Sequence, residues 1–466
     1  MLQLQTSERV AKLTQGLGPY AATSVVAGTI IGTGIFLVPS LMLGHVGSPL
    51  RVMAVWIVAG VLSLFGALGY AELGSALPAA GGEYVYLREA YGPGMGFLYG
   101  WTQFVVAKAA SIATIATGFL LYTAYFFPGL TKVVWQLRGA QDHAPIFRLT
   151  GLQVGATLVI LLLSGLNVLG VRRSGALQTG FTAAKLGVLA ILIGFGLVSG
   201  HGSFDHFRSA VPVPAGTTAA SGFLLATLSA LWAYDGWNNL SMVAGEVQDP
   251  RRNVPFAIIV GSLLVLGVYL LANLAYFYVL TPGEAAATNT IAVLAARRLL
   301  GDRGATFVAV GVLASTFASL NGSILSGSRI PYAQAQDQLL PEALGRVHPR
   351  YRTPHVAITA QAVLAGAFAL TGAYETLYTK AIYSEWIFYL LVTAGLMILR
   401  RRRPELPRPY RVLAYPLVPL AFVAVAMFLI ADTLRERPAD ALWSLGLIAT
   451  GIPAYFLWTA IRKQST

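Results

Sequence analysis

The stretch GTIIGTGIF, residues 28–36, decides the fold, because it places three glycines inside an apolar run that is long enough to cross a bilayer. In an uninterrupted helix each glycine would cost about 1 kcal/mol relative to alanine. A second stretch, LWAYDGWNN at residues 231–239, places Asp235 and Gly236 in the middle of another apolar run. The first stretch alone is equally typical of close helix packing. The matching interruption beside a carboxylate favours two membrane helices that are each broken in the middle.

The composition of the whole chain is that of a membrane protein. Of its 466 residues, 56% are hydrophobic and 11% are charged, whereas soluble domains carry roughly 25% charged residues. We therefore predict an all-α integral membrane protein with twelve membrane-spanning helices. The predicted spans are 19–43, 51–75, 95–126, 150–170, 177–199, 218–245, 255–281, 304–328, 355–372, 377–399, 412–432 and 441–461.

The two interruptions lie about 200 residues apart, at corresponding places in two halves of the chain, which is the pattern of an inverted-repeat transporter. We predict a 5+5 inverted repeat in which the first and sixth spans are discontinuous. The predicted organisation is a cytoplasmic N-terminal segment at 1–18, a first five-helix repeat at 19–199, a second five-helix repeat at 218–399, and two further helices with a short cytoplasmic tail at 400–466.

The positive charges indicate the orientation of these spans. With a cytoplasmic N-terminus, nineteen of the 32 Lys and Arg residues fall in inner segments and eleven in outer segments. This bias predicts that both termini are cytoplasmic. The net charge of +13 does not indicate a nucleic-acid partner, because the basic residues lie in short clusters between apolar spans. The run of four arginines at 400–403 also fits anionic lipid, although topology alone explains it.

A broken membrane helix exposes backbone groups that need partners, since each would cost several kcal/mol if left unsatisfied in hydrocarbon. A zwitterion supplies both kinds of partner. We expect amides that open the second half of span one to meet a carboxylate, and carbonyls at both breaks to accept an ammonium. Glycine fits such a site because a Cβ would stand where the ligand approaches. The predicted substrate-binding residues are Ile30, Ile31, Gly32, Thr33, Gly34, Ile35, Trp232, Ala233, Asp235 and Gly236.

Lys185 is the foremost of four ionisable residues predicted to lie inside spans. Charged groups there are functional candidates because each costs about 2.5 kcal/mol or more at a helix centre. Lys185 can act as a fixed cation in place of bound sodium, bonding the unwound carbonyls of span one and hydroxyls of span eight such as Ser319. Snorkelling toward the inner surface and proton coupling are the alternatives.

The other three buried charges have less defined roles. Asp235 can bind the side chain of a cationic substrate or accept local hydrogen bonds that hold the loop open. Lys108 and Glu385 can each pair with a polar group as structure, and Glu385 lies about 200 positions after Lys185, as an equivalent place in the second repeat would. Trp232 and Trp237 flank the second break and are predicted to gate the pocket, with plain packing as the alternative.

Catalytic and redox functions find little support in the sequence. The chain has no cysteine, which excludes disulfides, thiolate metal sites and cysteine nucleophiles. None of its six histidines forms an HExxH pair, and neither a GxSxG elbow nor a Walker loop is present. We expect no enzymatic activity, no cofactor and no metal.

Five segments, taken together and in order, resemble a known family. They are GTIIGTGIFLVPS at 28–40, ALGYAELGSALPAAGGEYVYLREAYG at 67–92, LWAYDGWNNL with GEVQDPRRNVPFAI at 231–258, NGSILSGSRIPYAQAQDQLLP at 321–341 and LRRRRPELPRPYRV at 399–412. The chain is similar to the amino acid-polyamine-organocation superfamily and, within it, to bacterial relatives of the L-type amino acid transporters.

This resemblance implies a LeuT-like fold of ten core helices plus two, alternating access and a midplane site. It places Lys185 where other carriers bind sodium, with Ser319 and Asn321 near it, and Trp232 as a gate. Animal members join a glycoprotein through a cysteine, so this chain is expected to work without a disulfide-linked ancillary subunit. Asp235 resembles members whose substrates include cationic amino acids, although carriers of neutral amino acids share the YDGW string.

We therefore predict a sodium-independent amino acid carrier of the inner (plasma) membrane that exchanges or imports L-amino acids by alternating access, with neutral substrates favoured over cationic ones. The leading alternative is proton symport, with Lys185 or Glu385 as the titrating group. A receptor that binds an amino acid without transporting it is a further alternative, for which the short tail leaves no output module.

Overall fold

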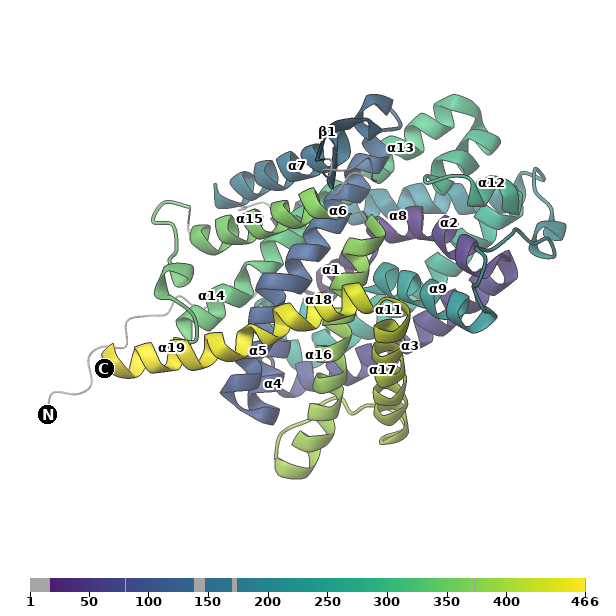
Figure 1. The fold of residues 1–466 in the computed structure, drawn as a ribbon. Coiled ribbons are helices and arrows are strands. Elements are labelled where there is room, and N and C mark those ends of the chain that lie inside the picture. The colour runs from purple at the N-terminus through teal and green to yellow at the C-terminus, as the bar shows by residue number, and fades with distance from the viewer. Residues whose placement is uncertain are drawn as a thin grey trace, which may run out of the picture.

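The computed structural model describes residues 17–79, 81–137, 147–169, 174–351, 353–372 and 374–465. Most of the predicted cytoplasmic segment at 1–18 lies outside these ranges, as do five of the basic residues that were counted as cytoplasmic, namely Arg9, Lys12, Arg172, Arg173 and Arg352. The described chain is a bundle of helices, with α19 extending beyond the others at the C-terminus (Figure 1).

The helices account for nearly all the regular structure. Their bounds are α1 (Pro19–Ile30), α2 (Gly34–Val46), α3 (Pro49–Ala76), α4 (Glu83–Tyr91), α5 (Pro93–Thr102), α6 (Lys108–Thr123), α7 (Gly151–Val168), α8 (Ser174–Val198), α9 (Ala219–Tyr234), α10 (Asn239–Met242), α11 (Pro250–Val279), α12 (Pro282–Ala286), α13 (Ile291–Gly327), α14 (Arg329–Gln336), α15 (His355–Thr371), α16 (Tyr374–Arg402), α17 (Leu417–Glu436), α18 (Pro438–Ala449) and α19 (Gly451–Ser465). A π-helical turn, Gln103–Ala107, joins α5 to α6. Strands β1 (Val133–Leu137) and β2 (Phe147–Thr150) pair antiparallel.

Ten helical segments among the described residues are long and apolar enough to cross a membrane. The shorter α9 and α15 account for the remaining two of the twelve predicted spans. Large apolar side chains on the outside of the bundle are exposed, as expected where lipid replaces water; Leu162 is 60% exposed and Phe456 is 65% exposed. The prediction of an all-α membrane protein is confirmed.

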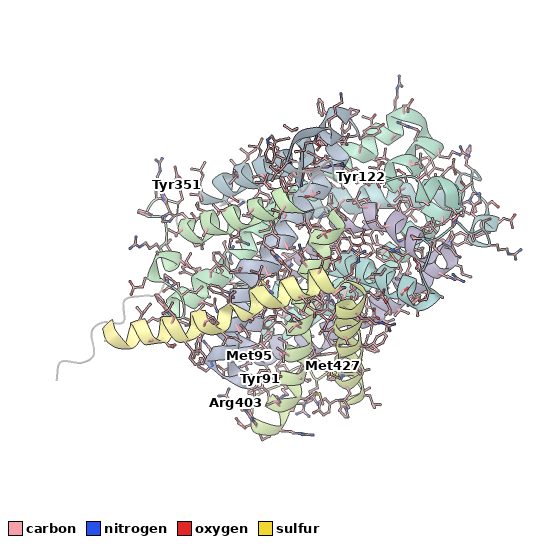
Figure 2. All side chains as sticks on the ribbon, in the orientation of Figure 1. Tyr91, Met95, Tyr122, Tyr351, Arg403 and Met427 are labelled. Atoms are coloured by element: carbon pink, nitrogen blue, oxygen red, sulfur yellow. The ribbon has the colours of Figure 1, made fainter. Side chains whose placement is uncertain are left out.

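Some spans differ from their predicted limits. Helix α13 starts at Ile291 rather than near 304, because a kink at Gly301, with φ of 67°, joins an outer helical segment to the span. The last span is divided at Thr450 into α18 and α19. Directly after α16, Arg403, labelled in Figure 2, contacts the carboxylate of Glu89.

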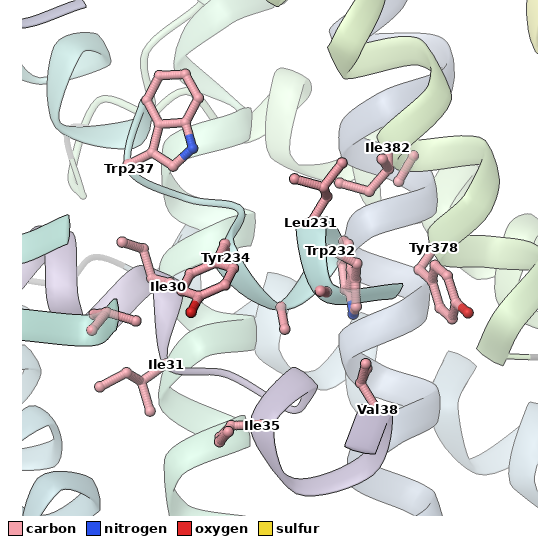
Figure 3. Close-up of a cluster of buried hydrophobic side chains, with 14 of the residues drawn as sticks. Ile30, Ile31, Ile35, Val38, Leu231, Trp232, Tyr234, Trp237, Tyr378 and Ile382 are labelled. Carbon is pink, nitrogen blue, oxygen red and sulfur yellow. The ribbon is translucent and has the colours of Figure 1, made fainter. Parts of the chain in front are cut away.

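Both predicted breaks are present. Helix α1 ends at Ile30 and α2 begins at Gly34, with non-helical chain between them (Figure 3). Helix α9 ends at Tyr234, and the chain resumes as α10 at Asn239. Gly236 has a φ of 119°, in the region that only glycine adopts without strain. A Cβ on it would lie 3.1 Å from the carbonyl carbon of Thr29, so the two breaks pass close to each other.

Candidate functional site

Lys185 ties the first break to two other helices. Its Nζ donates to the carbonyl of Gly28 at 2.9 Å, to the carbonyl of Ile31 at 2.8 Å and to Ser319 Oγ at 3.1 Å. The side chain is 1% exposed, so it does not snorkel to a surface. An ammonium at the C-terminal end of α1 is also favoured by the negative end of that helix dipole. All three of its donors are therefore used to hold the end of α1 against α8 and α13.

A cavity lies where the two broken helices meet. About 480 Å³ of space between its walls is free of atoms, part of it open to solvent. Residues from both breaks line it, together with side chains of α6 and α13. The lining residues are Thr29, Ile30, Gly32, Thr33, Gly34, Lys108, Ser111, Ile115, Trp232, Asp235, Gly236, Asn239, Ser319 and Ser323.

The start of α2 lies at the cavity, which Thr33 and Gly34 line. The first N–H groups of a helix have no partner within the helix, and α2 has no side-chain cap. Glycine at position 34 allows α2 to begin close against α9, because a Cβ there would lie 2.6 Å from Ala233 Cα. The amides of Gly34 and Ile35 therefore form an electropositive end suited to a carboxylate.

Most of the carbonyls that we expected to accept an ammonium already have protein donors. Ile31 O accepts from Lys185. The hydroxyl of Tyr269 lies 3.0 Å from both Ile30 O and Ala233 O, and thereby joins the two breaks. Ile30 O also accepts from the N–H of Gly32 at 2.8 Å, so both of its lone pairs are in use. A ligand ammonium would therefore share acceptors with the protein, which differs from the free carbonyls of the sequence prediction.

Trp232 is fixed by the first turns of α16. Its Nε1 donates to Tyr374 Oη at 3.1 Å, and Tyr374 Oη also lies 3.1 Å from Thr33 Oγ1. The indole stacks on Tyr378 with ring centroids 6.2 Å apart (Figure 3). The tyrosine hydroxyl thus connects the start of α2, the end of α9 and α16 on one side of the cavity.

The sequence matches known proteins along almost its entire length. A family model described as amino acid permease covers residues 17–450. The chain belongs to the amino acid permease family. This permease is therefore a multi-pass membrane transporter for amino acids and not an enzyme, and its resemblance to the amino acid-polyamine-organocation superfamily and the L-type transporters is confirmed.

Three relatives illustrate the range of similarity. The permease is 32% identical to the b(0,+)-type amino acid transporter 1 of Mus musculus over 456 residues, which cover 97% of this chain and 90% of the relative. It is 32% identical to the serine/threonine exchanger SteT of Bacillus subtilis (strain 168), over 95% of this chain and 97% of the relative. It is 34% identical to the human Asc-type amino acid transporter 1, over 98% of this chain and 84% of the relative.

Two members of the predicted cation group lie apart from Lys185 in the permease. Asn321 accepts from Asn167 Nδ2 at 2.7 Å, because two residues along a helix from Ser319 turn the side chain by about 200°. Glu385 accepts from Gln103 Nε2 at 2.9 Å. Among the described residues, Lys185 therefore bonds to Ser319, while Glu385 pairs with a polar side chain, as the structural alternative for it has it.

Trp237 does not line the cavity. Its ring packs edge-on against Tyr70, with centroids 4.7 Å apart, and lies 4.9 Å from the ring of Tyr389. It points away from Trp232 (Figure 3). These contacts correspond to the packing alternative for Trp237. The side chain that was predicted to gate the cavity together with Trp232 is not part of the cavity wall.

The sequence analysis overlooked Glu83, a fully buried carboxylate at the start of α4. It accepts from Tyr70 and from Asn238 Nδ2, both at 3.0 Å, and from Tyr99. Asn238 belongs to the second break, so Glu83 anchors the start of α10. The glycine pair before Glu83, in which Gly82 has a φ of 49°, was the available signal for a special turn at this place.

Proposed function

We propose that the permease is a sodium-independent carrier that exchanges or imports L-amino acids by alternating access, with neutral substrates favoured. The observation that carries this proposal is the ammonium of Lys185 at the end of α1. It donates to two carbonyls and one hydroxyl that would otherwise be oxygen ligands for a cation. A covalently attached cation makes a bound sodium ion unnecessary for holding the break together.

The proposed substrate pose uses both poles of an amino acid. The carboxylate meets the N–H groups at the start of α2, and the ammonium shares carbonyls at the ends of α1 and α9. Trp232, held by Tyr374, covers the site from one side and is the proposed gate. The lining of the cavity by residues of both breaks supports this arrangement.

The organisation around this site is part of the proposal. Residues 19–199 and 218–399 form two inverted repeats, which is supported by breaks at corresponding places, after Ile30 and after Tyr234. Both termini are cytoplasmic in the inner (plasma) membrane, as the distribution of basic residues indicates. The chain works without a disulfide-linked subunit, because it has no cysteine with which to form the link.

The test is countertransport by purified protein in liposomes. We expect uptake of labelled alanine only when the lumen contains amino acid, as the name of the Bacillus subtilis exchanger suggests. We also expect equal uptake in sodium and choline buffers. Lys185→Met should reduce uptake at least about tenfold, since a buried hydrogen bond to a charged group contributes roughly 1.5–3 kcal/mol. Lys132→Met, at an exposed position, should leave uptake unchanged.

Two outcomes would contradict the proposal. Uptake into an empty lumen that is driven by acid outside would establish proton symport, and Glu385→Gln would then identify whether Glu385 or Lys185 titrates. Failure of the folded protein to move any amino acid would leave only the receptor alternative.

A further inference from the structure

We infer that the side-chain end of the cavity selects amino acids with a neutral, dipolar side chain, namely a hydroxyl or a carboxamide, and that Lys108 determines this preference. The inference rests on the proposed transport function and specifies its substrate class. It starts from Lys108 and Asp235, which carry opposite charges and line the same cavity.

Lys108 is placed in the cavity by an irregular backbone. It is the first residue of α6, directly after the π-helical turn Gln103–Ala107. Such turns shift the side chains that follow them and are frequent at functional sites. A glycine at position 327 of α13 makes room for the lysine stem, because a Cβ there would lie 3.1 Å from Lys108 Cγ. The side chain is only 3% exposed.

The ammonium of Lys108 has N–H groups that can donate to a substrate. It donates to Asn239 Oδ1 at 3.0 Å, while an ammonium carries three N–H groups. Among the described residues, no carboxylate lies within ion-pair distance of it. Two hydroxyls, Ser111 and Ser323, line the cavity with it. This end of the cavity therefore offers hydrogen-bond donors to an acceptor on the substrate.

Asp235 supplies the opposite polarity. Tyr389 donates to Asp235 Oδ1 at 2.6 Å, which uses one of about four acceptor positions on a carboxylate. Asp235 and Lys108 do not form an ion pair with each other, although both lie on the cavity wall. A donor on the substrate can therefore reach the carboxylate while an acceptor reaches the ammonium.

The two charges together disfavour the other classes of side chain. A carboxylate side chain is attracted by Lys108 but repelled by Asp235, and an ammonium or guanidinium side chain is attracted by Asp235 but repelled by Lys108, so neither gains a net attraction. An aliphatic or aromatic side chain would displace water from both charges without replacing its hydrogen bonds, which is costly. A hydroxyl or carboxamide carries both a donor and an acceptor and satisfies both charges without adding a third.

The test compares isosteric substrates in the countertransport assay. Threonine and valine have nearly the same shape, as do asparagine and leucine. We expect unlabelled threonine and asparagine to compete against labelled alanine roughly 10- to 100-fold better than their apolar counterparts, the range given by one or two hydrogen bonds to charged groups. Lys108→Met should bring the threonine-to-valine ratio close to one, whatever rate of alanine exchange remains. Lys132→Met, at an exposed position, should keep the wild-type ratio.

The outcomes separate this inference from the proposed function. Wild-type protein that exchanges valine as well as threonine, or prefers arginine or glutamate to both, would overturn the inference even if no variant could be purified. An unchanged threonine-to-valine ratio in the residual exchange of Lys108→Met would also overturn it. Both results leave amino acid exchange standing, whereas the absence of exchange for every amino acid would overturn the function itself.

Discussion

Adding a single methyl group at Gly34 should impair transport by forcing apart the two broken helices. An ideal Cβ built on Gly34 lies 2.5 Å from Ala233 Cβ and 2.6 Å from Ala233 Cα. Carbon atoms pack best at about 3.5–4.0 Å, so α2 and α9 would have to separate by about 1 Å. The Cα of Ala233 belongs to the backbone, and no rotamer change can relieve the clash.

The expected magnitude follows from the cost of overpacking. Extra methyl groups in a well-packed core cost about 1–3 kcal/mol. Free protein can relieve this strain by letting α2 and α9 move apart, whereas closure around a substrate must bring them together again. If the cost falls on the closed state, substrate affinity decreases roughly 5- to 140-fold for Gly34→Ala. Gly34→Val, with a larger side chain, should abolish uptake.

Gly44 provides a matched control on the same helix. A Cβ at Gly44 would meet no atom within 4 Å, and alanine is favoured over glycine within a helix by about 1 kcal/mol. The assay is alanine exchange in liposomes, with the thermal midpoint of each purified variant measured in parallel. Gly44→Ala should exchange like the wild type and be at least as stable. If Gly34→Ala binds substrate within twofold of Gly44→Ala, the close approach of the two breaks is not required for transport.

Three further changes test other contacts. Tyr374→Phe removes a hydroxyl that contacts both broken helices, so the closed state of the cavity should be destabilised by about 1–2 kcal/mol. A single cysteine that replaces Ser111 in the cavity wall should then react faster with an impermeant thiol reagent. Glu72→Gln leaves buried arginines unpaired and should cost about 3–5 kcal/mol in thermal unfolding, whereas Arg403→Gln, in an exposed pair, should cost less than about 1 kcal/mol. Hydrogen bonds from the backbone and hydroxyl that cap α12 lower the pKa of Glu284. The contribution of Glu284 to the stability of α12 is therefore present above about pH 4.3 and lost as the pH falls through the lowered pKa. Protection of α12 against hydrogen exchange, relative to the intrinsic rate at each pH, should fall there and should not change in Glu284→Gln.

The breaks could be predicted because their causes are local. Glycines within an apolar run, and a carboxylate at Asp235, disfavour a continuous helix whatever surrounds them. Lys185 could be identified for a similar reason, since an isolated charge in a membrane span needs acceptors and the nearest unwound backbone supplies them. The structure accordingly places its Nζ on two carbonyls of the first break.

The side chains that complete the site could not be found in this way. Tyr269 contacts Ile30 across 239 positions of sequence, and Tyr374 contacts Thr33 across 341 positions. Tyrosines are also common at membrane interfaces, so their composition alone does not distinguish a site residue from an anchor. These contacts depend on which helices pack together, and that information is tertiary. The contacts of Lys108 with Asn239 and of Glu83 with Asn238 could not be predicted from the sequence for the same reason.

The distribution of these contacts indicates how the broken helices can move. Lys185 holds the end of α1 nearest the break, through two of the three hydrogen bonds that its ammonium donates. Tyr374 holds the start of α2 and the end of α9 through neutral hydrogen bonds, which are individually weaker than bonds to a charge. Each half-helix is therefore tied beside the cavity, and opening should pivot about these points rather than pull the cavity walls apart. The hydrogen bonds of Tyr374 are weaker than those of Lys185. In substrate-free protein the cavity should therefore open more readily by loss of the Tyr374 hydrogen bonds than by loss of the Lys185 hydrogen bonds.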